Sequence, residues 1–181
     1  MEELLKDSKF LSKKIESIKT IASLRSLLIK LLAIVIICYV IFNYFFGLYR
    51  MHGISMTPNI SDGDLMIVYR LDTDYHKGDI VSLYKNGKTS FLRIVATAGQ
   101  VVDITPEGEL IVNNHLEDNE SFFKTLPNDN SDIKFPIIVG KDQVFLLNDY
   151  RENSEDSRVY GAINVNELSG KIITILRTKN V

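Results

Sequence analysis

The longest uninterrupted apolar stretch of the chain runs from Leu31 to Tyr49, nineteen residues without a charge, in which only Asn43 is strongly polar. A helix of this length can span a bilayer core of about 30 Å. A cleavable signal peptide has a shorter apolar core and a small-residue cleavage site soon after it, and no such site follows here. The pattern therefore predicts an uncleaved transmembrane helix over residues 31–49.

The charges around this stretch predict its orientation. Residues 1–30 contain seven Lys and Arg, whereas Arg50 alone follows the stretch closely. The positive-inside rule then makes residues 1–30 a cytoplasmic N-terminal segment, and residues 50–181 an extracytoplasmic domain of a single-pass cell-membrane protein. Apolar residues at roughly helical spacing within residues 1–30 fit a helix on the inner membrane surface or a solvated helix equally well.

Beyond residue 50 the pattern changes to short apolar or β-branched runs separated by turn signals such as Asn86-Gly87, which favours a hairpin. No helix longer than a turn or two is required, and the polar segment 117–136 predicts an excursion or flap that could cover a cleft. The fold predicted is an all-β domain carried by one N-terminal transmembrane helix. The predicted strands are Leu65–Tyr69, Ile80–Tyr84, Ser90–Thr97, Val101–Ile104, Glu109–Val112, Gln143–Leu147 and Lys171–Leu176.

Composition narrows the possible functions. The whole chain has a formal net charge of -2, but residues 50–181 hold fourteen Lys and Arg against nineteen Asp and Glu, a net charge of -5. An acidic domain argues against binding to nucleic acid. Cys38 is the single cysteine and the three histidines are scattered, so we expect no disulfide, no metal site and no cofactor.

Residues 53–64 form a loop pattern leading into the first predicted strand of the domain. Gly53 permits unusual backbone angles, Pro58 fixes φ, and Asp62-Gly63 is a turn signal. Ser55 thus lies on a rigid, non-helical loop that could present a nucleophile to a substrate. A serine between Gly and Pro is also compatible with ordinary turn chemistry.

The pattern Gly53-x-Ser55-Met56-x-Pro58, followed by Asp62-Gly63-Asp64, resembles the nucleophile box of the type I (leader) signal peptidases. These are membrane-anchored serine endopeptidases that remove signal peptides from exported proteins. The segment Leu147–Gly161, here called the Asp156 segment, resembles a second box of that family, Gly-Asp-Asn-Arg leading into Ser-x-Asp-Ser-Arg-x-x-Gly. The resemblance extends from about Arg50 to Arg177.

The Asp156 segment departs from the family box at two positions, because Asn148 stands in the Gly position and Tyr150 in the Asn position. The resemblance implies that Ser154 hydrogen-bonds the catalytic base and that Asp156 and Arg158 hold the shape of the site. An acidic and a basic residue flanking one small residue can brace a loop through charge-assisted hydrogen bonds.

The family's general base is a lysine in a Lys-Arg-x-x-x-x-Pro-Gly-Asp box, and this chain departs from it. The matching stretch runs from Leu92-Arg93 to Ala98-Gly99-Gln100, so Leu92 occupies the position of the base lysine. A leucine has no proton-accepting atom, and the guanidinium of Arg93 stays protonated. Other candidates are nearby but weaker: Lys85 and Lys88 belong to the preceding turn, with Lys88 four residues from Leu92, and His52 precedes Ser55 by three residues.

Two hypotheses follow from the resemblance. The leading one is a signal peptidase I-type serine endopeptidase, with Ser55 as nucleophile, that binds signal peptides or exported pre-proteins as an extended strand at the lipid membrane. The alternative is a catalytically inactive signal-peptidase-like binding protein or chaperone that assists surface-protein assembly. Divergent family members of that kind are associated with pilus assembly in Gram-positive bacteria, which makes pilus subunits or assembly machinery candidate partners.

Overall fold

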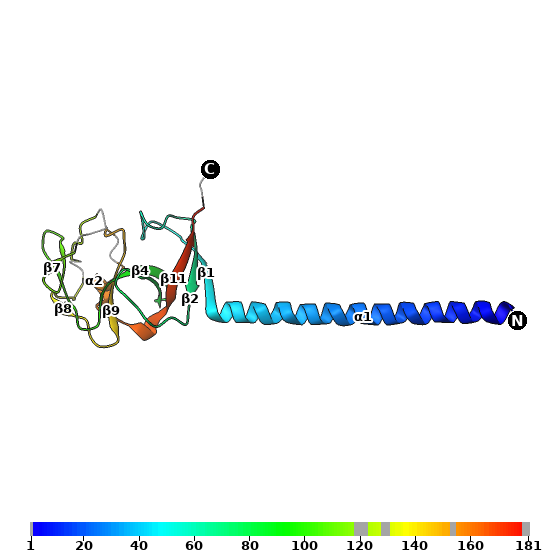
Figure 1. Cartoon of the computed structure of the whole chain (residues 1–181). Coiled ribbons are helices and arrows are strands. Elements are labelled where there is room, and N and C mark those ends of the chain that lie inside the picture. The colour runs from blue at the N-terminus through cyan, green and yellow to red at the C-terminus, as the bar shows by residue number, and fades with distance from the viewer. Residues whose placement is uncertain (1, 118–122, 128–130, 153–154, 179–181) are drawn as a thin grey trace. The chain divides into compact units, whose positions relative to one another are not determined.

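The computed structural model describes residues 2–117, 123–127, 131–152 and 155–178 (Figure 1). The chain divides into two compact units, residues 1–44 and residues 45–181. The first unit is helical and the second is built mostly from β-strands.

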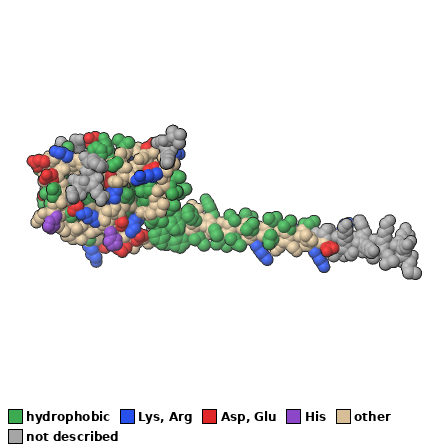
Figure 2. All heavy atoms as spheres, turned by 45° about the horizontal axis from the view of Figure 1, so that its top comes forward, with side chains coloured by type: hydrophobic (Ala, Val, Ile, Leu, Met, Phe, Trp, Pro, Cys, Tyr) green, Lys and Arg blue, Asp and Glu red, His purple; other side chains and the backbone are tan. Residues whose placement is uncertain are grey.

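The N-terminal unit consists of helix α1, Glu2–Phe45. Its part Ile18–Phe45 includes an 18-residue window with a mean hydropathy of 2.4 and is long and apolar enough to cross a membrane. Hydrophobic side chains cover this part of the helix in Figure 2, and none of the span is buried within the protein. An exposed helix of this composition suits a lipid environment, as expected for a single-pass membrane anchor.

The helix ends four residues before the boundary predicted at Tyr49, which corrects that expectation. Residues Phe46–Arg50 form strand β1, which pairs antiparallel with β2, Leu65–Tyr69, in the register Phe46↔Tyr69 to Arg50↔Leu65. The ring of Tyr49 packs edge-on against Phe91, with centroids 5.6 Å apart. Hydropathy alone does not separate the end of an apolar helix from an apolar strand that follows it directly.

The domain contains a seven-stranded antiparallel sheet in the order β1-β2-β11-β3-β4-β9-β10. Strand β11, near the C-terminus, lies between β2 and β3 (Figure 1), and β2 separates it from the edge strand β1, so strands from both ends of the domain belong to the same side of the sheet. The remaining strands of this sheet are β3 (Ile80–Lys85), β4 (Lys88–Thr97), β9 (Gln143–Leu147), β10 (Ile163–Asn164) and β11 (Leu168–Leu176).

A second, four-stranded sheet has the order β7-β6-β5-β8. Its strands are β5 (Val101–Ile104), β6 (Leu110–Val112), β7 (His115–Leu116) and β8 (Ile137–Ile138). The helical elements of the described part of the domain are short, namely α2 (Ser157–Tyr160) and the 3-10 turn η1 (Val165–Glu167). The all-β prediction is therefore confirmed, and the strands that the sequence pattern missed are β1 and the two-residue strands β7, β8 and β10.

Neighbouring residues of β4 belong to two different apolar clusters. Phe91 belongs to a cluster with Met51, Met56, Ile60, Met66 and Val68, which lies under the loop that carries Ser55. Leu92 belongs to a different cluster, shared with β3 and β9. Successive residues of a strand point to opposite faces, which explains why these neighbours serve separate clusters.

The predicted excursion 117–136 falls partly on residues 118–122 and 128–130, which lie outside the described residues. Its described residues form neither helix nor strand. Within it the Thr125 side chain is fully buried and accepts a hydrogen bond from Arg151.

Candidate active site

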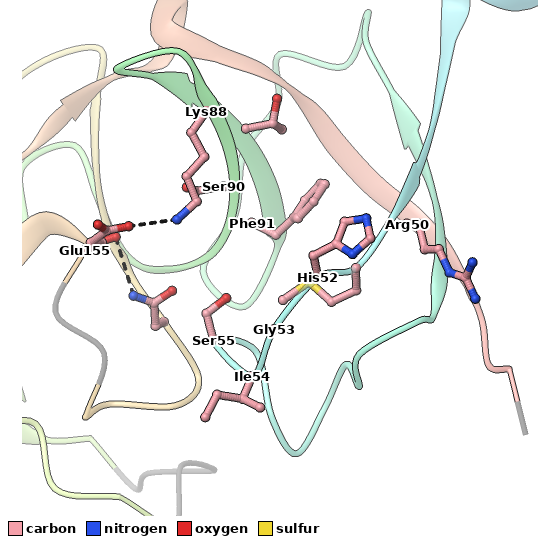
Figure 3. Close-up of a pocket in the computed structure, with 12 residues that line it drawn as sticks. Arg50, His52, Gly53, Ile54, Ser55, Lys88, Ser90, Phe91 and Glu155 are labelled. Carbon is pink, nitrogen blue, oxygen red and sulfur yellow. Dashed lines mark hydrogen bonds and ion pairs between the residues drawn. The ribbon is translucent and has the colours of Figure 1, made fainter. Parts of the chain in front are cut away.

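Ser55 lies in a pocket of about 370 Å³ (Figure 3). Three parts of the chain form its walls: residues 50–55, residues 88–91 at the start of β4, and Asn148 with Glu155 from the Asp156 segment. The site thus joins segments that are about thirty to a hundred residues apart in the sequence.

Buried side chains and local hydrogen bonds fix the Ser55 loop, residues 53–64. Gly53 has φ +84°, in the left-handed region that favours glycine, and its backbone N–H donates to the Asp62 carboxylate at 2.8 Å. The side chains of Met56 and Ile60 are fully buried and anchor the loop to the core. Ser55, next to the anchored Met56, remains only half-buried and reaches the pocket.

Two polar contacts connect the Ser55 loop to the Asp156 segment. The backbone N–H of Tyr150 donates to the Ser55 carbonyl oxygen at 3.0 Å. The Asn59 amide donates to the Asp149 carboxylate at 2.9 Å. Pro58, the other box residue of this loop, directly precedes Asn59 and follows a cis peptide bond.

Arg93 completes this connection. Its Nε and Nη2 donate to the two carboxylate oxygens of Asp149 at 2.8 and 2.7 Å, and its Nη1 donates to the Gly78 carbonyl oxygen at 2.8 Å. A bidentate pair of this kind fixes the relative position of two segments more firmly than a single bond does. Asp149 lies within the Asp156 segment, but the sequence resemblance assigned it no role.

Asp156 and Arg158 form a second bidentate ion pair, and both side chains are at most 2% exposed. The Arg158 Nε and Nη2 donate to the Asp156 carboxylate at 3.0 and 2.8 Å. Asp156 also accepts from the Arg158 backbone N–H at the start of α2, and from the Asn148 backbone N–H at 3.2 Å. The Arg158 Nη1 donates to the carbonyl oxygens of Arg151 and Leu126. Through these hydrogen bonds the pair connects α2 to the loop after β9 and to residue 126.

Arg151 is a further buried cation of this segment that sequence reasoning did not single out. Its Nη1 donates to the Thr125 hydroxyl at 3.1 Å, and its Nε has no hydrogen-bond partner among the described residues. Burial lowers the pKa of Arg151 to about 10, and the nearby carboxylates of Asp156 and Asp149 oppose this shift. Ser154, to which the resemblance assigns a role, lies outside the described residues.

Leu92 is fully buried in the cluster that it shares with Val81, Leu83 and Leu146. It is not among the residues that line the Ser55 pocket, whereas Lys88 and His52 are. Lys88, the weaker candidate four residues before Leu92, enters the pocket from its own position at the start of β4. Lys85 pairs instead with Glu167 at 3.3 Å.

We expect Leu92→Lys to lower the free energy of unfolding near neutral pH by about 3 kcal/mol or more, because an ammonium would replace a fully buried apolar side chain. Burial lowers the pKa of the introduced lysine below its ordinary value of about 10.4. The unfolded chain then binds more protons between the two pKa values, so the stability of this variant should recover as pH rises through that window.

Urea unfolding of the variant in detergent micelles at a series of pH values measures this effect. Leu92→Met keeps the volume and is the matched control, which should cost less than about 1.5 kcal/mol at every pH. A stability loss for Leu92→Lys that does not depend on pH would contradict the prediction, since it would mean that the amine reaches water.

The chain is similar to known signal peptidases. It is 26% identical over 144 residues to "Signal peptidase I" of Bacillus caldolyticus, covering 71% of this chain and 78% of the relative. It is 29% identical over 142 residues to "Signal peptidase I P" of Bacillus subtilis subsp. natto, covering 71% and 75%. A crystal structure of a signal peptidase I from Enterococcus faecalis V583 aligns with 56% of this chain and 97% of its own, at 22% identity and a TM-score of 0.43.

The family model described as "Signal peptidase, peptidase S26" matches residues 24–176. This range includes the Ser55 loop, β4 and the whole Asp156 segment, together with most of the apolar part of α1. Because the match extends over well more than half of the sequence, the chain belongs to the signal peptidase family, peptidase S26.

Proposed function

We propose that the chain is a membrane-anchored serine endopeptidase of the signal peptidase I type, with Ser55 as the nucleophile and the signal peptides of exported proteins as substrates. The observation that carries the proposal is the placement of Ser55 on a loop anchored by buried side chains, at the wall of a pocket. A nucleophile needs such fixed presentation, because the reacting atoms must be held close together.

The start of β4 offers a place for the substrate backbone. Residues 88–92 pair with β3 on one side, whereas pairing of β4 with β9 begins only at Arg93. Within the described residues the other edge of 88–92 therefore has no strand partner, and residues 88–91 line the Ser55 pocket. An extended peptide can add to such an edge as a further strand and bring its carbonyl groups past Ser55.

The apolar helix supports a location of this site at the membrane. Helix α1 has the length and composition of a membrane span, and the charge bias of residues 1–30 favours a cytoplasmic N-terminus. The domain would then lie on the extracytoplasmic side, where the junction between a signal peptide and an exported chain emerges.

The test uses the full-length protein in lipid vesicles with a labelled pre-protein whose signal peptide ends in Ala-x-Ala. Cleavage and binding are measured separately, and the mass of the product locates the cut. A cut directly after Ala-x-Ala supports the proposal. The absence of both cleavage and binding, under conditions in which a known signal peptidase processes the same vesicles, would contradict it.

A second function is favoured by one observation, the complete burial of Leu92 among apolar side chains at the position where the family has its base lysine. A chain without a base could still hold an exported protein in the same cleft and act as a binding protein. Binding without cleavage over the whole accessible pH range would favour this function over the peptidase.

A further inference from the structure

We infer that Lys88 is the general base of this site, in place of the lysine that the family carries where this chain has Leu92. The inference rests on the proposed function, since it assigns a residue to the same reaction. It concerns a position on β4 that is four residues earlier than the expected one.

The geometry of the pocket points to Lys88. Lys88 and Ser55 line the same pocket from opposite walls, and Figure 3 shows the amino group of Lys88 and the hydroxyl of Ser55 directed into it. Lysine carries its amino group on a flexible four-carbon stem, so a residue at the start of β4 can serve a nucleophile farther along the cleft.

The present partner of Lys88 does not hold it firmly. Its Nζ lies 3.0 Å from a carboxylate oxygen of Glu155, and the two side chains are 68% and 61% exposed. Exposed ion pairs of this kind contribute little to stability, so a rotation of the stem away from Glu155 and toward Ser55 costs little. Glu155 belongs to the Asp156 segment and lines the pocket, so the amino group of Lys88 lies at the pocket wall even in this pairing.

A substrate would favour this rotation. A peptide strand added along residues 88–92 covers the pocket and removes water from it, which disfavours a charged ammonium and favours the neutral amine. The charged and titratable groups that line the pocket together with Lys88 are Glu155, His52 and Arg50.

The Lys88 lone pair takes the proton of the Ser55 hydroxyl while Oγ bonds to the substrate carbonyl carbon, whose π electrons move to oxygen. Collapse of this intermediate breaks the carbon–nitrogen bond, and the leaving amine takes the proton from Lys88. Water next attacks the acyl ester, gives a proton to Lys88, and the released Ser55 oxygen takes that proton back.

His52 is the competing proton acceptor of the pocket. Its imidazole is exposed, and Figure 3 shows the ring on the Arg50 side of Phe91, away from Lys88 and Glu155. Histidine side chains in general accept protons in a lower pH range than lysine side chains do, so the pH profile of cleavage distinguishes the two candidates.

The experiment measures the rate of pre-protein cleavage by the full-length protein in vesicles between about pH 6 and pH 10. Lys88→Met and Lys88→Arg should each lower the rate by about 10²- to 10⁴-fold, since neither side chain can accept the proton. Lys85→Met is the matched control. Lys85 lies opposite Lys88 across the same hairpin, pairs with Glu167, and does not line the pocket, so the rate should stay unchanged.

Chemical rescue separates a base from a merely structural lysine. In a Cys38→Ser background the chain has no other cysteine, so Lys88→Cys can be alkylated selectively with 2-bromoethylamine to restore an amine on a sulfur-containing stem. The sulfur makes this amine less basic, so rescued cleavage should begin at a lower pH than in the native chain.

The outcomes separate the inference from the proposed function. Cleavage that Ser55→Ala abolishes but Lys88→Met leaves intact, or that His52→Ala alone removes, overturns the role of Lys88 and keeps the peptidase. A rescued protein with an unshifted pH profile also overturns that role. A native chain that binds the pre-protein and never cleaves it overturns both.

Discussion

Replacement of Ser55 by alanine should lower the rate of pre-protein cleavage by at least about 10⁴-fold, because it removes the hydroxyl that would form the acyl ester with the substrate. Binding should persist, since the loop is held by the Ser55 backbone and by the buried side chains of Met56 and Ile60, which the substitution leaves in place. Vesicle assays that score cleavage and pre-protein binding separately measure both results.

Ser61→Ala is the matched control for this substitution. Ser61 is an exposed serine of the same loop that contacts Asp64 through its backbone: its N–H donates to the carboxylate at 3.0 Å, and its carbonyl oxygen accepts from the Asp64 N–H at 3.2 Å. The variant should cleave at the native rate. Native-like cleavage by Ser55→Ala would exclude Ser55 as the nucleophile, and an equal loss in both variants would indicate a damaged loop instead.

Arg158→Met should lower the free energy of unfolding by about 3–5 kcal/mol, because it leaves the fully buried Asp156 carboxylate without its cation. The substitution also removes the donors to the carbonyl oxygens of Arg151 and Leu126. For a domain of this size the expected decrease in melting temperature is about 10 °C or more. Thermal unfolding in detergent micelles measures it.

Cleavage should fall together with stability in Arg158→Met, since Asp156 also binds the backbone of Asn148, a residue of the pocket wall. Lys85→Met, which breaks the partly exposed ion pair with Glu167, is the control and should change stability by about 1 kcal/mol or less. Equal stability of the two variants would mean that the Asp156–Arg158 pair has no structural role.

The strands that the sequence predicted well are those with a clear hydrophobic pattern and a turn at each end. The bounds of β2, β5 and β9 agree with the predicted ranges. Strand β1 was missed because it continues the apolar run of α1 without a break in hydropathy. The two-residue strands β7, β8 and β10 are too short to show any periodicity.

The sequence by itself determined the family, the apolar anchor, the all-β domain and the absence of a proton acceptor at Leu92, because each of these depends on local patterns or on residue identity. Only the tertiary structure decided which side chains share the Ser55 pocket. Lys88 enters that pocket while Leu92, four residues later, is buried in the core. Likewise, Asn59 and Arg93 meet at Asp149 only once the loop and the sheet are assembled. Such contacts join residues far apart in the chain, and they depend on strand pairing and loop packing that a local pattern does not specify.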